Sequence, residues 1–145
     1  MTPAIQQSVE FDAKPETLYE MYMDSKQHDQ ATGAPAKVSR KAGGAFTAFG
    51  GQLKGKNLLL IPNKMIVQSW RAEMWKTSDP DSILVIQFNK TKAGSRVDLV
   101  HVNAPEYDHQ GVTDGWHHYY WEPWREYLEA LALKRKAARR SKRTK

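Results

Sequence analysis

The side chains best suited to chemistry lie in the segment GVTDGWHHYYWEPWREYLEAL (residues 111–131), which holds three Trp, three Tyr and two His. With about 100° of rotation per residue, one face of a helix over this segment would be aromatic and apolar. That face collects Trp116, Tyr120, Trp124, Tyr127, Leu128 and Leu131. His117 falls inside it, His118 lies on the charged side, and Pro123 lacks the N–H needed for a regular helix. The spacing predicts an amphipathic helix, kinked or restarted at Pro123, with one imidazole on its inner face.

A second imidazole belongs to the β-rich run SRVDLVHV. With Asp98 pointing outward, the two-residue period of a strand places Val97, Leu99 and His101 on the inner side. His101 and His117 are therefore predicted to face one cavity. Each imidazole has two possible roles. It is either a core His that is hydrogen-bonded to a backbone carbonyl or to water, or a polar group that orients a ligand among apolar walls.

Most conventional catalytic machinery is missing from the sequence. The chain has no Cys, which excludes disulfides, thiolate zinc sites and Cys nucleophiles. It contains neither His-Glu-x-x-His nor Gly-x-Ser-x-Gly, and GGAFTAFGG lacks the Lys-Ser or Lys-Thr that closes a phosphate-binding loop. We expect no metal, no cofactor and no assigned catalytic residue. A weaker alternative is a cyclase or hydrolase with His101 or His117 as general base.

The elements that must position these residues follow a clear order. A strand at residues 5–11 precedes two short helices that end near Gly33. About six short β-rich runs follow between residues 36 and 102, separated by turn residues, and their close spacing predicts an antiparallel meander. Only the final helix is long enough to cover one face of such a sheet. The fold class is therefore predicted as α+β, a curved antiparallel sheet of six to seven strands wrapped around a C-terminal helix.

Length and hydropathy limit the cellular setting. A chain of 145 residues is long enough for one domain with a sizeable core. It has no window of about 18 apolar residues, and its N-terminus lacks the basic and apolar regions of a signal peptide. We predict a cytoplasmic protein with no membrane span.

The positive charge is concentrated at the C-terminus. The chain carries a formal net charge of +6, but after Glu129 it contains no acid. Removing the eight final cations leaves 14 Lys and Arg against 16 Asp and Glu, a net charge of −2 for the rest. We predict a disordered tail over residues 134–145 that is either simply solvated or makes weak nonspecific contact with nucleic acid or an anionic surface. Its cations are Lys134, Arg135, Lys136, Arg139, Arg140, Lys142, Arg143 and Lys145.

Three stretches carry a resemblance to a known family: TGAPAKVSRKAGGAFTAFGGQLKGKNLLLIPNKMIVQSWR, SRVDLVHVNAP and GWHHYYWEPWREYL. Their order and spacing resemble the START-like, or SRPBCC, superfamily, in the branch called activator of heat-shock protein ATPase homologue-like. The resemblance runs from about Val9 to Leu131. It implies a helix-grip fold over residues 1–133, in which the C-terminal helix crosses the curved sheet and leaves a cavity between them.

The pocket predicted from these considerations has walls from sheet and helix. The sheet side would contribute Phe46, Trp70, Ile86, Phe88, Leu99 and His101, and the helix side Trp116, His117, Tyr120 and Trp124. The main functional prediction is noncatalytic binding of a small hydrophobic ligand, aromatic or lipid-like. The resemblance also implies an alternative, a stress-response interaction module acting on a heat-shock chaperone ATPase. A filled core is the structural explanation for the same aromatic residues.

Overall fold

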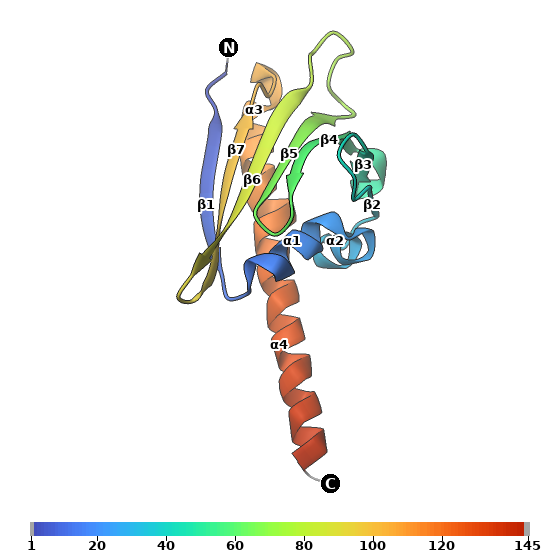
Figure 1. Cartoon of the computed structure of the whole chain (residues 1–145). Helices are drawn as coiled ribbons and strands as arrows, with labels where there is room; N and C mark the ends of the chain where they lie inside the picture. Colours follow the sequence, from blue (N-terminus) through green and yellow to red (C-terminus); the bar gives the residue numbers. More distant parts are fainter. Residues whose placement is uncertain (1, 144–145) are drawn as a thin grey trace.

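The computed structural model describes residues 2–143, with side chains described through Ser141. Seven antiparallel strands form one sheet in the order β1-β7-β6-β5-β4-β3-β2 (Figure 1). The strands are β1 (Ile5–Phe11), β2 (Ala36–Val38), β3 (Ala45–Ala48), β4 (Leu53–Ile61), β5 (Met65–Ala72), β6 (Ser82–Thr91) and β7 (Gly94–Val102). The predicted α+β helix-grip fold, with its six to seven strands and two short helices after the first, is confirmed.

Strands β2 to β7 follow one another as hairpins, and β1 joins the far edge of the sheet beside β7. In that pairing Ile5 lies opposite His101 and Val9 opposite Val97. The two-residue period buries Ile5, Val9 and Phe11 on the inner face. The first strand thus completes the wall that holds His101.

Two short helices close one end of the sheet. Helix α1 (Pro15–Met23) starts with Pro15, whose missing N–H costs nothing in the first helical turn. Helix α2 (Ser25–Thr32) is capped by the Asp24 carboxylate and ends at Gly33, which adopts the left-handed conformation with φ 78°. Buried side chains of both helices join the inner core.

The C-terminal segment is continuous but changes its helical type. Helix α3 (His109–Gly115) leads into a π-helical turn (Trp116–Trp121), and α4 (Glu122–Arg143) follows. At the junction the Glu122 N–H donates to the His117 carbonyl, an i to i+5 bond. The wider turn ends just before Pro123, whose ring would clash with the carbonyl four residues earlier in a regular α-helix. The predicted change near Pro123 therefore takes the form of a π-turn.

The part of the predicted disordered tail that the structure describes, residues 134–143, is helical. Helix α4 continues through Arg143 and extends well beyond the sheet (Figure 1). Ala, Lys and Arg are strong helix formers, and cations near a helix C-terminus interact favourably with the helix dipole. The predicted cation Lys145 lies outside the described residues, as do the side chains of Lys142 and Arg143.

Across the described part of the chain, residues 2–143, no helix combines the length and apolar character needed to cross a membrane.

Candidate functional site

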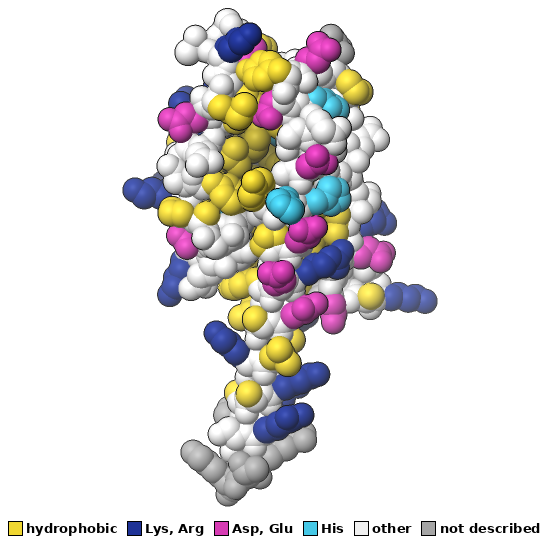
Figure 2. All heavy atoms as spheres, turned by 180° about the vertical axis from the view of Figure 1, so that it is seen from behind, with side chains coloured by type: hydrophobic (Ala, Val, Ile, Leu, Met, Phe, Trp, Pro, Cys, Tyr) yellow, Lys and Arg dark blue, Asp and Glu magenta, His cyan; other side chains and the backbone are white. Residues whose placement is uncertain are grey.

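An apolar cavity opens between the α3–π segment and the β3–β5 region of the sheet. Its volume is about 520 Å³. From outside it appears as a hollow with a hydrophobic floor beside the C-terminal helix (Figure 2). It is lined by Phe49, Gln52, Leu53, Trp70, Ala72, Glu73, Met74, Asp108, Gly111, Val112, Gly115, Trp116, Tyr119 and Tyr120.

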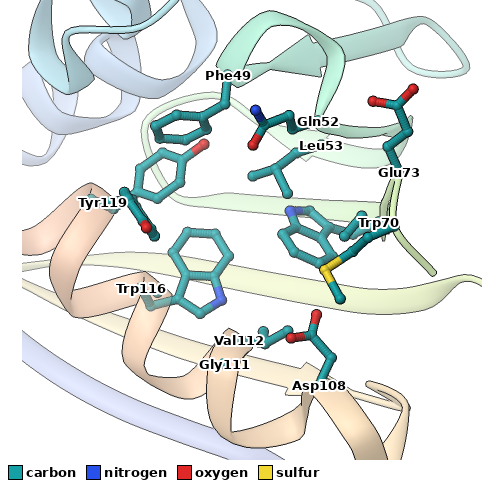
Figure 3. A pocket seen from close by; sticks show the side chains of 14 residues that line it. Phe49, Gln52, Leu53, Trp70, Glu73, Asp108, Gly111, Val112, Trp116 and Tyr119 are labelled. Atoms are coloured by element: carbon teal, nitrogen blue, oxygen red, sulfur yellow. The ribbon is translucent and has the colours of Figure 1, made fainter.

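Aromatic rings form the walls of this cavity (Figure 3). The Trp116 and Tyr120 rings lie 4.7 Å apart between centroids, and Trp70 faces Trp116 at 6.3 Å. Phe49, in the turn after β3, meets the edges of Tyr119 and Tyr120 at 5.6 and 5.7 Å. These contacts link a strand, a turn and a helix, so the cavity shape depends on all three.

Polar groups are few and stand mainly at the rim. Gln52 and Glu73 are exposed there, and one Asp108 oxygen accepts a 2.7 Å hydrogen bond from the Trp75 indole. Within the cavity wall, the buried Trp70 Nε1 has no hydrogen-bond partner in the described structure. An unpaired buried donor is costly, since it has lost its water without replacement. The cavity therefore combines a large apolar surface with one unused donor.

His101 lies behind the aromatic wall, in a chain of hydrogen bonds that runs from Trp116 to the Trp70 carbonyl. The Trp116 Nε1–H donates to His101 Nδ1 at 3.1 Å, and His101 Nε2–H donates to Ser82 Oγ at 2.7 Å. Ser82 in turn donates to the Trp70 carbonyl at 2.6 Å, which leaves its oxygen as the acceptor for His101. Burial, with a smaller effect of His109, lowers the pKa of His101 to about 3. The imidazole is neutral, and both of its nitrogens are occupied.

A second buried imidazole, His28 on α2, was missed by the sequence analysis. Its Nδ1–H donates to the Tyr22 carbonyl at 2.8 Å, and its Nε2 accepts from the Tyr120 hydroxyl at 2.9 Å. Burial lowers the pKa of His28, which keeps the ring neutral and suits this pattern. The surrounding sequence SKQHDQ is polar throughout, so no local signal distinguishes this buried His from an exposed one.

The Tyr22 hydroxyl continues this polar interior. It donates to Gln68 Oε1 at 2.8 Å, and the Gln68 amide donates to Asn57 Oδ1 at 2.9 Å. Asn57 completes the chain by donating to the Ser39 and Lys41 carbonyls. Burial raises the pKa of Tyr22 far above the ordinary tyrosine value, so its proton stays in place. The His101 network contacts the cavity wall at Trp116. The network of His28 and Tyr22 contacts it at Tyr120, also from the core side.

Only part of the predicted pocket lines the cavity. Trp70, Trp116 and Tyr120 stand in its wall, and His101 lies one layer behind them. The other predicted sheet residues and Trp124 are buried in the core outside the cavity lining; they are Phe46, Ile86, Phe88, Leu99 and Trp124. Phe46 packs over Gly55, where a Cβ would come within 2.7 Å of its ring. These five residues therefore belong to the filled hydrophobic core and do not line the cavity.

The predicted inward position of His117 is wrong, because its side chain is exposed. The π-turn makes residues five apart share a face, so Trp121 stacks on Trp116 with centroids 5.5 Å apart. This rotation centres the buried face on Val112, Trp116 and Trp121 and turns His117 towards solvent. A uniform 100° wheel could not show this shift.

Several cavity residues were absent from the sequence prediction. Phe49 and Gln52 come from the turn after β3, Met74 follows β5, and Tyr119 lies on the outer side of the 100° wheel. Two adjacent turn glycines, Gly50 and Gly51, with φ 65° and 96°, bring Phe49 to the cavity. The turn residues between the β-rich runs predicted a chain reversal, but not the side that an aromatic residue within it would face.

The two imidazoles considered as general bases in the sequence do not line the cavity. Among the side chains that the structure describes, no group of three or more His, Cys, Asp and Glu could hold a metal ion. His101 is occupied at both nitrogens and His117 faces solvent, so neither is placed as a general base at the cavity. The ionisable side chains that do line the cavity include the exposed Glu73 and Tyr119, and Asp108, whose carboxylate accepts the Trp75 indole N–H.

Comparisons with solved structures agree with the observed fold. An HSP90 activator from Plasmodium falciparum superposes with a TM-score of 0.74 and 23% identity, covering 82% of this chain and 91% of that one. The Aha1 dimer from Colwellia psychrerythraea gives a TM-score of 0.68 and 18% identity, with 90% and 93% covered. At these identities the likeness establishes the fold alone.

Sequence relatives give the family. The activator of 90 kDa heat shock protein ATPase homolog of Dictyostelium discoideum is 24% identical over 115 residues, 79% of this chain and 30% of that protein. The human homolog 1 is 27% identical over 112 residues, 77% of this chain and 33% of that protein. This chain thus spans about a third of the length of these relatives. The family profile described as "Activator of Hsp90 ATPase homolog 1-like protein" matches residues 12–129. With nearly the whole fold inside that match, the chain belongs to the Activator of Hsp90 ATPase homolog 1-like family.

Proposed function

We propose that this domain is a noncatalytic interaction module that binds an Hsp90-type chaperone ATPase. The observation that carries the proposal is the family match over residues 12–129, because relatives within that match are named as activators of this ATPase. The predicted cytoplasmic and stress-response setting remains part of this proposal.

The sheet offers a surface for such a partner on its outer face. Leu59, Val67, Val85 and Val100 lie side by side on four neighbouring strands, since each is the register partner of the next. Leu59 is 47% exposed, and the other three are half-buried. The described helices pack on the opposite face (Figure 1). An uncovered aliphatic row of this kind is a common feature of protein-binding surfaces.

The test is a binding and ATPase assay with the Hsp90-type chaperone of the same organism. Leu59→Arg places a charge in the aliphatic row and is expected to weaken binding at least ten-fold without changing Tm. Gln6→Arg adds the same charge at the exposed polar end of the row, opposite Val100, and should leave binding within two-fold. If the wild-type protein neither binds the chaperone nor changes its ATPase rate, the proposal is wrong.

A second candidate function is supported by the cavity itself. A volume of about 520 Å³ with aromatic walls suits a small hydrophobic molecule, and the free Trp70 N–H could donate to one acceptor on it. Leu53 lies half-buried in the wall, so Leu53→Trp should fill the space. Leu58→Trp, on an exposed strand residue outside the cavity, is the matched control.

Two experiments test binding of a small hydrophobic molecule. The first is native mass spectrometry of protein purified from its own host, and the second is a thermal-shift screen of apolar compounds. A bound molecule is expected in the wild-type protein and in Leu58→Trp, and its loss in Leu53→Trp. Absence of any bound or stabilising compound in the wild-type protein would count against a ligand function and leave the chaperone proposal intact.

A further inference from the structure

The far end of α4 is a projecting helix whose described side chains are cationic and exposed. Residues 132–141 are all exposed, and this part of α4 extends away from the body (Figure 1). Five of its cations have described side chains: Lys134, Arg135, Lys136, Arg139 and Arg140. The backbone continues as a helix through Arg143, and the sequence contains no acid after Glu129. The positive end is attached to a body of net charge −2.

The described cations spread over about two thirds of the helix circumference rather than forming one narrow face. At about 100° per residue, Lys134 and Lys136 point in nearly opposite directions, and Arg135 and Arg139 fall between them. Figure 2 shows basic side chains on both sides of the projecting end. After Leu133 the only apolar residues are Ala137 and Ala138. A helix that lies in a membrane interface needs a continuous apolar face, usually with aromatic residues, and this segment has neither.

The groove of a nucleic-acid duplex matches this distribution. The major groove of B-form DNA is about 12 Å wide and admits an α-helix, with phosphates along both walls. Cations on opposite sides of a helix can therefore reach both strands at once. Residues 134–143 extend about 15 Å at the α-helical rise, enough to span several phosphates. We propose that the projecting end of α4 binds double-stranded DNA without strong sequence preference, through phosphate contacts from Lys134, Arg135, Lys136 and Arg139.

The same residues predict a structural response on binding. Arg135 and Arg139 are four residues apart, as are Lys136 and Arg140, and like charges at this spacing destabilise a helix. Phosphates between them would remove that repulsion. The helical circular-dichroism signal should therefore rise when duplex is added.

The test measures fluorescence anisotropy of a 20-base-pair duplex with the full chain at several salt concentrations. Each phosphate contact adds about 0.9 to the slope of log K against log salt. The variant Lys134→Gln/Arg135→Gln/Lys136→Gln/Arg139→Gln should bind at least ten-fold more weakly and lose about three to four units of that slope. The control Lys54→Gln/Lys56→Gln/Lys90→Gln/Lys92→Gln removes four exposed positive charges from the body and should change affinity less than two-fold.

Three outcomes would overturn the proposal. The first is equal loss in the helix and body variants, which would make binding a matter of total charge. The second is equal affinity for single-stranded DNA of the same length, which would exclude the groove. The third is binding to phosphatidylserine vesicles with none to duplex, which would assign the helix to a membrane surface. None of these measurements involves the chaperone, so the result is independent of the proposed function.

Discussion

The two halves of the C-terminal helical segment have opposite physical roles. In the first half, Trp116, Tyr120, Trp121 and Trp124 are almost completely buried against the sheet and α1–α2. In the second half, from residue 132 to residue 141, every side chain is exposed. The first half is held by packing against the body, whereas the described side chains of the second half contribute no buried surface. The comparison shows that a continuous helix can be a structural core element at one end and an independent surface at the other.

The largest expected contrast comes from truncating one side chain in each half. Trp124→Ala removes a fully buried indole and should lower the free energy of unfolding by about 3–5 kcal/mol. Leu133→Ala removes a side chain that is 66% exposed and should change it by no more than about 0.5 kcal/mol. Urea denaturation of both variants measures the difference. Equal losses would mean that the second half packs against the body.

A smaller contrast uses two serines. Ser82→Ala leaves the buried His101 Nε2–H without an acceptor and should cost about 1–3 kcal/mol of folding stability. Ser78→Ala, at an exposed position in the loop after β5, should stay within about 0.5 kcal/mol of the wild type. Thermal and chemical denaturation of the two variants give the comparison. A stable Ser82→Ala protein would show that water or a rearranged side chain replaces the lost acceptor.

Acid should destabilise the fold through the two neutral imidazoles, His101 and His28, that bond to the packed half. Because the folded pKa of His101 is lowered to about 3, the unfolded chain binds a proton between pH 6.5 and 3 that the folded chain does not. The contribution of His101 to the free energy of unfolding is therefore fully present above about pH 6.5, and it decreases as the pH falls. From pH 8 to pH 5.5 the His101 contribution is about 1.4 kcal/mol, and His28 acts in the same direction.

Urea denaturation at pH 8, 6.5 and 5.5 measures this loss. A chain that ends at Leu133 should lose the same amount, because both imidazoles bond to the packed half, at Tyr120 and Trp116, and none of their hydrogen bonds involves the described residues that are removed. A flat profile would mean that the imidazoles become hydrated or protonated in the folded protein.

The smallest effect is expected from removing the exposed half altogether. A chain that ends at Leu133 should unfold within about 0.5 kcal/mol of the full chain, since residues 134–141 are exposed. Its circular-dichroism spectrum should lose the helical signal of about ten residues. A marked drop in Tm would contradict the separation of the two halves.

The fold was predictable because its main signals are local. The two-residue alternation in SRVDLVHV and the turn residues between short β-runs follow from backbone geometry, and both appear in β7 and its neighbours. The helical spacing of Trp116, Tyr120 and Trp124 likewise identified an inner face. The π-turn was not predictable in this way, because one added residue per turn changes the orientation of side chains on both sides of it.

The candidate site was only partly predictable. The family resemblance implied a cavity, and Trp70, Trp116 and Tyr120 were predicted to line it; these three residues lie in the wall of the observed cavity. Phe49 reaches the cavity through a turn, and His28 is buried by contacts with residues as distant as Tyr120. Such placements depend on how turns and helices meet in space, which periodicity does not report.

By itself, the sequence determined the antiparallel sheet, the covering helix and the basic end, because each follows from the type and spacing of neighbouring residues. Only the tertiary structure decided which imidazoles are buried, which aromatic rings fill the core and where space remains. The physical reason is that a cavity is a small difference in packing between elements far apart in the chain. Trp70, Trp116 and Phe49 enclose it from three such elements, and no one of them specifies it alone.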